Sequence, residues 1–514
     1  MNEFLNKVLK YYNLSLEEYE KLSAPVTLND LPYAYAFFNF EKFMMRIEEA
    51  IKNDEEVVIY GDYDADGIMA TSILKKAFLK RGKNVYTMIP SRYKDGYGLN
   101  ERAVNRLHKR GITLIITVDN GVSAHKAIKH ANSLGIDVLV SDHHELSATL
   151  PDAYAVLHPD LSSLPAINSC GAYMALVISY GLLTYYDEYL VSLAAIATLA
   201  DMMPLVDRNR TVVKLGISFL NINKPFSVST LNGSQLFDEV SLGMRVAPRI
   251  NALGRLSQNY EANILVEYFT TDDVKRMYDI SVYVEKVYEE RKNLSKASEL
   301  SEEELNNPAI VLLTTELEGI LGLIAQSYLL THNKPALIFT ESSEDDTLIK
   351  GSARSSSGFN VVEAFATLKD YILASGGHPE AGGLTIKKAD FLNFKRDFLA
   401  YAALHPLVSK KEKYIEAHFE DLNPENYKII NNLAPFGFKF PSPTIKIVDG
   451  NTYKYTYSRD GKHIISTLEN GIKLIGFSLG EEVRNKKEFA IYGTFSQSEF
   501  RNVVSIEFKI KQII

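Results

Sequence analysis

The sequence of 514 residues contains no tryptophan and a single cysteine, Cys170. One cysteine cannot form an internal disulfide, so the chain fits a reducing compartment. No apolar run reaches the ~18 residues that a membrane-spanning helix needs. The N-terminal residues are amphipathic and lack the apolar centre of a secretion signal. We therefore expect a cytoplasmic protein with no membrane association.

Positive charge is also scarce, since 56 Lys and Arg stand against 64 Asp and Glu, for a net charge of −8. This balance does not exclude nucleic-acid binding, because a site can be locally basic or made positive by metal ions. Residues 411–514 hold 15 basic and 13 acidic residues, net +2, and carry aromatic residues such as Tyr453, Tyr455 and Tyr457. The C-terminal end is therefore relatively basic.

Short apolar runs alternate with helical patterns from about residue 55 to 160. The β-rich segments are 56–62, 83–90, 112–121, 137–145 and 153–160, and the helical ones are 67–82, 100–111 and 125–135. This alternation predicts an α/β fold with a parallel, doubly wound sheet.

The rest of the chain changes character three times. Helical patterns dominate up to about residue 306, a second α/β pattern follows, and consecutive strand patterns fill the C-terminal end, including 453–458. We predict an N-terminal helical segment (1–50), a first α/β domain (51–205), a helical connector (206–306), a smaller α/β domain (307–405) and a small β-barrel domain (411–514).

Acidic and imidazole side chains follow the predicted strands of the first domain. The stretch "YGDYDADG" places Asp62, Asp64 and Asp66 directly after an apolar run. Later strand ends carry Asp119, the run Asp142-His143-His144, and His158, and Asp201 interrupts an apolar helix. Ligands bind at the carboxyl ends of strands in such sheets, so these side chains should meet.

Each of these residues has a simpler explanation when taken alone. A single Asp at a strand end usually caps a turn or a helix, and a histidine pair is usually structural. These explanations would all have to hold at once, and a buried acid still needs a partner. Carboxylates and imidazoles without thiolates favour Mn²⁺ or Mg²⁺ over structural zinc. So many ligands suit a pair of ions, which can clamp a phosphoryl group.

Several motifs together resemble the DHH phosphoesterase superfamily, and most of all its single-strand-specific 5′→3′ exonucleases. They are "GDYDADG", "TVDNGVS", "SDHHE", "LAAIATLADMMPL" and "RINALGRL", in this order, followed by "SGGHPEAGGLTI", which resembles the DHH-associated domain. The resemblance implies a metal shell of Asp62, Asp64, Asp66, Asp119, His143 and Asp201. It makes His144 a ligand or acid/base group, oriented by Asp142, and leaves His158 as a structural residue. Asp64 and Asp66 are expected to ligate most directly, and Asp62 least.

The same resemblance implies a substrate-binding set, because arginine forks match phosphate oxygens. The candidates are Arg92, Arg249, Asn251, Arg255, Ser352, Arg354, Gly376, Gly377 and His378. Without the family, the arginines could be ordinary surface residues and "SGGHPEAGG" a flexible loop. The C-terminal strands resemble an OB-fold, although "FKFPSP" stands where the family usually has Gly-Asn-Pro-Glu-Pro.

The implied function is metal-dependent 5′→3′ hydrolysis of single-stranded DNA to 5′-mononucleotides, in DNA repair and recombination, by a monomer. Helicases and single-strand-binding proteins are candidate partners that the sequence does not distinguish. One alternative is a phosphodiesterase of the same superfamily that acts on short oligoribonucleotides or small nucleotides. Another is a non-catalytic DNA-binding relative, although such relatives lose metal ligands that this sequence keeps.

Overall fold

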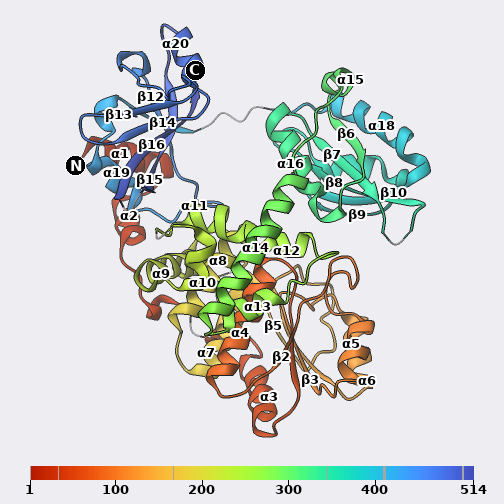
Figure 1. Ribbon diagram of the computed structural model, residues 1–514. Helices are drawn as coiled ribbons and strands as arrows, with labels where there is room; N and C mark the ends of the chain where they lie inside the picture. Colours follow the sequence, from red (N-terminus) through yellow and green to blue (C-terminus); the bar gives the residue numbers. More distant parts are fainter. Residues whose placement is uncertain are drawn as a thin grey trace.

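Three β-sheets organise the chain in the computed structural model, which describes residues 2–32, 34–165, 167–234, 236–343, 345–408, 413–500 and 503–514. The first sheet lies on one side of a central group of helices, and the other two sheets lie on the opposite side (Figure 1). Both chain ends lie at the third sheet, although the N-terminal residues precede the first. No helix among the described residues is both long and apolar enough to cross a membrane.

The first sheet is parallel throughout, with strand order β2-β1-β3-β4-β5, as predicted. Its strands are β1 (Val57–Tyr60), β2 (Tyr86–Met88), β3 (Leu114–Val118), β4 (Asp137–Ser141) and β5 (Ala155–Leu157). The helices between them are α4 (Ala65–Lys80), α5 (Glu101–His108) and α6 (His125–Ser133). Val57 and Ile59 pack on one side of the sheet and Val58 and Tyr60 on the other, as the two-residue period of a strand requires.

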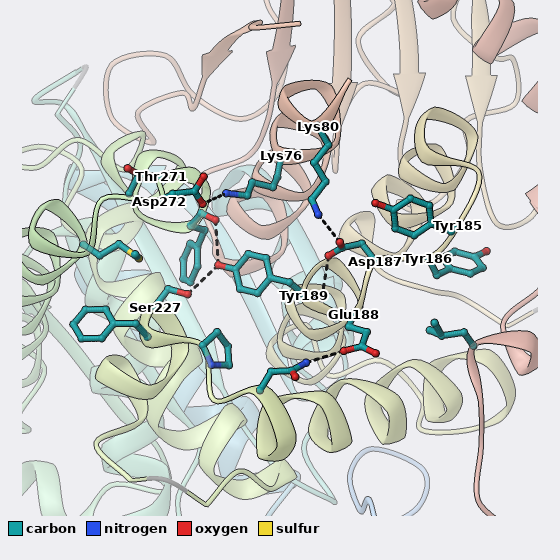
Figure 2. Close-up of a pocket in the computed structure, with 16 residues that line it drawn as sticks. Lys76, Lys80, Tyr185, Tyr186, Asp187, Glu188, Tyr189, Ser227, Thr271 and Asp272 are labelled. Atoms are coloured by element: carbon teal, nitrogen blue, oxygen red, sulfur yellow. Dashed lines mark hydrogen bonds and ion pairs between the residues drawn. The ribbon is translucent and has the colours of Figure 1, made fainter. Parts of the chain in front are cut away.

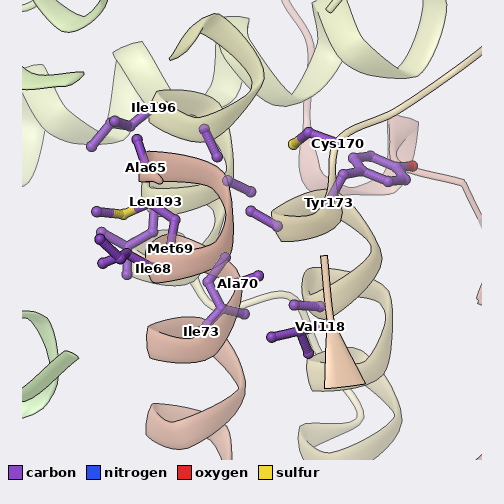
Figure 3. Close-up of a cluster of buried hydrophobic side chains, with 14 of the residues drawn as sticks. Ala65, Ile68, Met69, Ala70, Ile73, Val118, Cys170, Tyr173, Leu193 and Ile196 are labelled. Carbon is purple, nitrogen blue, oxygen red and sulfur yellow. The ribbon is translucent and has the colours of Figure 1, made fainter. Parts of the chain in front are cut away.

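Helix α4 is apolar around most of its circumference because it lies between the sheet and two further helices. These are α7 (Gly171–Leu183) and α8 (Glu188–Ala200), and Figure 3 shows their side chains interlocking. Ile68, Met69, Ile73 and Leu193 are fully buried there. This packing fixes the N-terminal end of α4, which carries the acidic motif.

A series of helices follows residue 206, and most of them contribute buried side chains to this core. They are α9 (Asp207–Asn223), α10 (Phe226–Asn232), α11 (Glu239–Ser241), α12 (Ala247–Arg255), α13 (Ile264–Thr270), α14 (Val274–Leu294) and α15 (Glu302–Asn306). Buried residues such as Val212, Leu253 and Val284 belong to the same cluster as α4. The apolar core is thus continuous across the predicted domain boundary at 205, and that boundary stays a prediction.

The second sheet is mixed, with order β6-β7-β8-β10-β9. Its elements are β6 (Ile310–Thr314), α16 (Leu321–His332), β7 (Ala336–Glu341), β8 (Leu348–Arg354), α17 (Val361–Thr367), β9 (Ile372–His378), β10 (Ala381–Lys387) and α18 (Phe391–Leu404). Only β6 and β7 are parallel. The stretch "SGGHPEAGG" is a β-hairpin between β9 and β10, so it is not a loop without regular structure.

The third sheet contains six strands in the order β11-β12-β15-β16-β14-β13. Its elements are β11 (Tyr414–Ala417), α19 (Pro424–Asn431), β12 (Thr444–Ile447), β13 (Ile464–Thr467), β14 (Lys473–Gly476), α20 (Gly480–Asn485), β15 (Ile491–Phe500) and β16 (Val503–Ile513). The prediction of a strand at 453–458 is wrong, because this segment makes only an isolated bridge between Tyr457 and Ile464. Its alternating tyrosines pack inward instead, and the buried Tyr455 hydroxyl donates to the Gly450 carbonyl.

The N-terminal residues are helical, and they divide between two regions. Helices α1 (Glu3–Tyr12) and α2 (Leu16–Ser23) pack with the third sheet, where Phe4 and Val8 join its core. Helix α3 (Phe40–Lys52) packs with the first sheet instead. The chain therefore begins on the domain where it ends.

Leu193→Ala should lower the free energy of unfolding of the first domain by about 3 kcal/mol, because it leaves a cavity between α8 and α4. Leu79→Ala, at a residue of α4 that is 38% exposed, is the matched control and should cost well below about 1 kcal/mol. Urea unfolding followed by circular dichroism measures both. Equal destabilisation by the two substitutions would contradict this packing.

Candidate metal centre

The loop from Asp62 to Asp66 is shaped by the start of α4. Asp64 caps this helix, and its Oδ1 accepts hydrogen bonds from the backbone N–H groups of Asp66 (3.0 Å) and Gly67 (3.1 Å). From α12, Asn251 Oδ1 accepts the N–H of Ala65 at 2.8 Å. Helix α12 comes so close that a Cβ on Gly254 would lie 2.0 Å from the Tyr63 carbonyl oxygen. Glycine and asparagine in "RINALGRL" therefore hold the acidic loop in place.

The predicted acidic and imidazole residues meet at the carboxyl edge of the first sheet. The Nε2 atom of His143 lies 3.1 Å from Asp119 Oδ1, 3.5 Å from Asp66 Oδ2 and 3.7 Å from Asp201 Oδ2. Asp66 also accepts the N–H groups of Gly171 (2.6 Å) and Ala172 (2.7 Å) at the start of α7. The described residues therefore bring four sequence-distant segments to one place.

Burial makes this concentration of carboxylates costly. It raises the pKa of Asp62 to about 8, with the Asp64 carboxylate adding to the rise. It likewise raises the pKa of Asp201 to about 8, with Asp66 and Asp64 contributing. The pKa of Asp119 is raised well above its usual value by burial and then by the charges of the neighbouring carboxylates. Such shifts mean that the protein itself supplies too little positive charge to offset the negative charge.

The side-chain chemistry fits divalent metal ions. Buried atoms without a hydrogen-bond partner include Asp62 Oδ1, Asp119 Oδ1, Asp201 Oδ2 and His143 Nδ1. Their residues fall into groups whose ligand atoms lie within 4.8 Å of one another: Asp62, Asp64 and Asp119; Asp66, His143 and Asp201; and Asp119, His143 and His144. The first two groups share no residue, which suits a pair of ions. Because one Asp62 oxygen is buried and unpaired, the structure gives no reason to rank it below Asp64 and Asp66.

Asp142 anchors both histidines of the "SDHHE" motif. Its Oδ1 lies 2.7 Å from His144 Nδ1 and accepts the N–H of His143, while its Oδ2 accepts the N–H of Val122. Burial alone would lower the pKa of His144, but the hydrogen bond to Asp142 raises it to about 9. The Tyr97 hydroxyl lies 3.1 Å from the same Nδ1 and 3.2 Å from Nε2 of His144.

His158 is held away from the acidic residues. Its Nε2 lies 2.8 Å from the His144 carbonyl oxygen, and its Nδ1 accepts the N–H of Asp160. These bonds agree with its assignment as a structural residue.

Four arginines converge beside the acidic loop, at the junction with the second sheet. The Arg255 guanidinium donates to the Gly319 carbonyl at 3.2 Å. Burial, together with the charges of Arg92, Arg291 and Arg354, lowers the pKa of Arg255 to about 10. Three of these four arginines were predicted from sequence motifs.

The fourth, Arg291, was not predicted from the sequence. It lies in a charged run of α14 where nothing in the local pattern distinguishes it from a solvated lysine or arginine. Its Nε is buried without a hydrogen-bond partner, although its guanidinium lies over the Tyr288 ring. Arg92 stacks in a similar way, with its guanidinium 4.6 Å from the ring centre of Tyr63 in the acidic loop.

Ser352 joins the cluster through a hydrogen bond from Arg354 Nη1 at 3.2 Å. Arg249 lies beside Arg291, because its guanidinium is 4.4 Å from the centre of the same Tyr288 ring, and the other predicted substrate-binding residues are bonded elsewhere. Arg249 forms a two-pronged ion pair with Glu285, at 2.6 and 3.0 Å, and Asn251 is bonded to the acidic loop. Gly376, Gly377 and His378 lie in the exposed hairpin, where their hydrogen bonds are those of the β9–β10 ladder. Their roles toward a substrate stay predictions.

A cavity of about 670 Å³ opens between α4, α8, α10 and α14, away from these residues (Figure 2). Its two lysines are already paired, Lys76 with Asp272 and Lys80 with Asp187, each at 2.6 Å. The Tyr189 hydroxyl is likewise bonded to Ser227. Because its charged groups offset one another, this cavity offers no free cation to a phosphate.

Comparison with protein families matches three consecutive regions of the chain. The DHH family N-terminal domain matches residues 56–202, the DHHA1 domain matches 279–403, and the RecJ OB domain matches 415–512. The chain therefore combines a DHH domain, a DHHA1 domain and a RecJ OB domain in this order. The DHH region holds the acidic cluster, and the RecJ OB domain is the third sheet.

Individual members of the RecJ family resemble the chain over most of its length. It is 31% identical to the single-stranded-DNA-specific exonuclease RecJ of Bacillus subtilis, over 91% of this chain and 62% of that protein. A crystal structure of an exonuclease RecJ bound to manganese is 29% identical, with a TM-score of 0.60 over 74% of this chain and 97% of that one. RecJ of Thermus thermophilus in complex with Mn²⁺, at 24% identity, shares the fold with a TM-score of 0.79 over 99% of this chain and 76% of that chain.

Asp119→Ala should abolish tight Mn²⁺ binding, because the Asp119 carboxylate belongs to two of the three candidate ligand groups. Isothermal titration with Mn²⁺ measures this without reference to activity. Asp152→Ala, at an exposed aspartate of the same domain, is the control and should bind as the unmodified protein does. Unchanged Mn²⁺ affinity in Asp119→Ala would remove the proposed metal centre.

Proposed function

We propose that the chain is a divalent-metal-dependent exonuclease that hydrolyses single-stranded DNA from its 5′ end, releasing 5′-mononucleotides. The observation that carries this proposal is the juxtaposition of the buried acidic cluster with the four arginines around Arg255. One set attracts metal cations and the other attracts phosphate, as phosphodiester hydrolysis requires. The named activity of the relatives supports the same substrate.

The acidic cluster would hold Mn²⁺ or Mg²⁺ through Asp62, Asp64, Asp66, Asp119, His143 and Asp201. Such ions, when bound, polarise the phosphodiester and make water a better nucleophile. Asp142 holds His144 in one orientation, and His144 remains partly exposed at the edge of the cluster. His144 would donate a proton to the departing 3′ oxygen.

The arginine cluster would hold the 5′ end of the strand. Arg255, Arg291 and Arg354 carry positive charge in a partly buried place where few carboxylates offset it. A phosphate that enters this place would replace the hydration that the guanidinium groups lose on burial. Gly322 leaves room for the Arg354 side chain, because a Cβ there would lie 2.6 Å from its Nη2. A pocket that accepts a terminal phosphate would set the 5′→3′ direction.

A monomer in the cytoplasm, acting in DNA repair and recombination, completes the proposal. Helicases and single-strand-binding proteins stay candidate partners. The chain spans 62% of the length of the Bacillus subtilis relative, so contacts made by the rest of that protein are not transferred here.

A single assay separates the proposed activity from its rivals. The protein is incubated with Mn²⁺ and long single-stranded DNA labelled at either end, beside a dinucleotide and a blunt duplex. Early release of the 5′ label from the long strand alone is the expected result. Turnover of the dinucleotide alone would favour a small-nucleotide phosphodiesterase, and binding without turnover would favour a non-enzyme.

Arg291→Met should weaken binding of a 5′-phosphorylated oligonucleotide about tenfold, the loss of one charge-assisted contact, and should weaken binding of the 5′-hydroxyl form less. Fluorescence anisotropy in Ca²⁺ compares the two ligands without cleavage. Arg102→Met, at an exposed arginine of α5, is the control. An equal loss for both ligands would contradict a role at the terminal phosphate.

A further inference from the structure

The stretch "FKFPSP", which departs from the family pattern, contains the residue that joins the two main apolar cores. Among the described residues, Phe440 alone packs against both the core around α4 and the core of the RecJ OB domain. Its ring stacks on Tyr12 of α1, with ring centres 4.8 Å apart and planes 15° apart. On the catalytic side, the Arg210 guanidinium lies 4.7 Å from the same ring centre.

Arg210 also binds the backbone of the segment that leads to Phe440. From α9, its Nη1 donates to the Pro435 carbonyl at 2.8 Å, and its Nη2 donates to those of Leu433 (2.5 Å) and Ala434 (3.2 Å). The side chain is buried, and this burial lowers its pKa to about 10. A buried cation that satisfies three carbonyl groups and stacks on an aromatic ring is costly to detach.

The same segment touches the chain just beyond a predicted metal ligand. Leu205, four residues after Asp201, donates its N–H to the Phe438 carbonyl at 3.0 Å. Gly437 lies so close that a Cβ there would be 2.8 Å from a methyl carbon of Leu205. The OB domain is therefore bonded to the segment that leaves the metal centre.

Two further contacts restrain the same pair of domains. Lys214, one turn along α9 from Arg210, donates to the carbonyls of Leu22 (2.9 Å) and Ala24 (2.7 Å), where the N-terminal helices end. At the far end of β15, Glu499 accepts hydrogen bonds from the Ser234 hydroxyl and the Leu236 N–H. Because the two domains also contact each other at Lys214 and at Glu499, the OB domain cannot rotate freely about the Arg210 contact.

We propose that Arg210 and Phe440 are positioning residues that fix the OB domain relative to the metal centre. A strand held on the OB domain then reaches the acidic cluster in one register. The statement about the strand rests on the proposed exonuclease activity, whereas the positioning role of Arg210 and Phe440 does not. A fixed spacing raises the effective concentration of a long strand at the metal centre and does nothing for an oligonucleotide too short to reach the OB domain.

The domain geometry is measured by electron–electron double resonance between spin labels at Lys286→Cys on α14 and Glu469→Cys in the OB domain, both exposed. The native Cys170 is buried and does not compete for label. Arg210→Met should broaden or shift the distance distribution, and Phe440→Leu should do so to a smaller degree. Thr211→Ala, beside Arg210 and bonded only to its own helix, should leave a single narrow distribution.

Cleavage kinetics supply the second readout. Arg210→Met should raise KM for long single-stranded DNA about tenfold or more, and should leave kcat/KM for a short oligonucleotide within about twofold. If Arg210→Met does not fold, the same measurements on Phe440→Leu test the proposal. A distance distribution unchanged in every folded variant would overturn the proposal. An inactive parent protein with a narrow distribution that Arg210→Met broadens would overturn the exonuclease assignment and leave the positioning role intact.

Discussion

The carboxylates of Asp62, Asp64, Asp119 and Asp201 are held around Asp66 in a buried place, where burial and the neighbouring negative charges raise their pKa values. Most of the surrounding architecture can be understood as the means of holding them there. The parallel sheet brings its strand ends to one edge, and the start of α7 donates two backbone N–H groups to Asp66. Helix α12 presses on the acidic loop through a glycine and an asparagine. Divalent cations supply the charge that these contacts lack.

The arginine cluster places positive charge beside the crowded carboxylates. Arg92, Arg255, Arg291 and Arg354 come from the DHH region, two central helices and the second sheet, so the cluster exists only when these parts are assembled. The acidic cluster and the arginine cluster lie on two sides of one junction. A substrate that is anionic and also binds metal ions, such as the end of a nucleic-acid strand, would be oriented by this arrangement of charges. In the proposed function, the arginines would contact the phosphodiester backbone, which is the same at every nucleotide, and would need no base-specific contacts.

The first sheet and the convergence of the acidic and imidazole residues were predictable because their signals are local. Apolar runs ending in Asp or His mark strand ends, and the parallel topology brings those ends together. The assembly of distant parts was less predictable. Arg291 has no local signature, α1 and α2 pack on a domain more than 400 residues away in sequence, and the tyrosines at 453–458 alternate like a strand but pack into the domain core. Phe440 stood out only as a departure from a family pattern, and its contacts with Arg210 and Tyr12 give that departure a structural reason.

The proposed metal centre requires the acidic cluster to bind two divalent ions side by side. Low-temperature electron paramagnetic resonance of the protein titrated with Mn²⁺ tests it most directly, because neighbouring Mn²⁺ ions couple magnetically. A coupled signal should grow as the second ion binds, and it should be lost in Asp119→Ala. A six-line spectrum of isolated Mn²⁺ at saturation would contradict it.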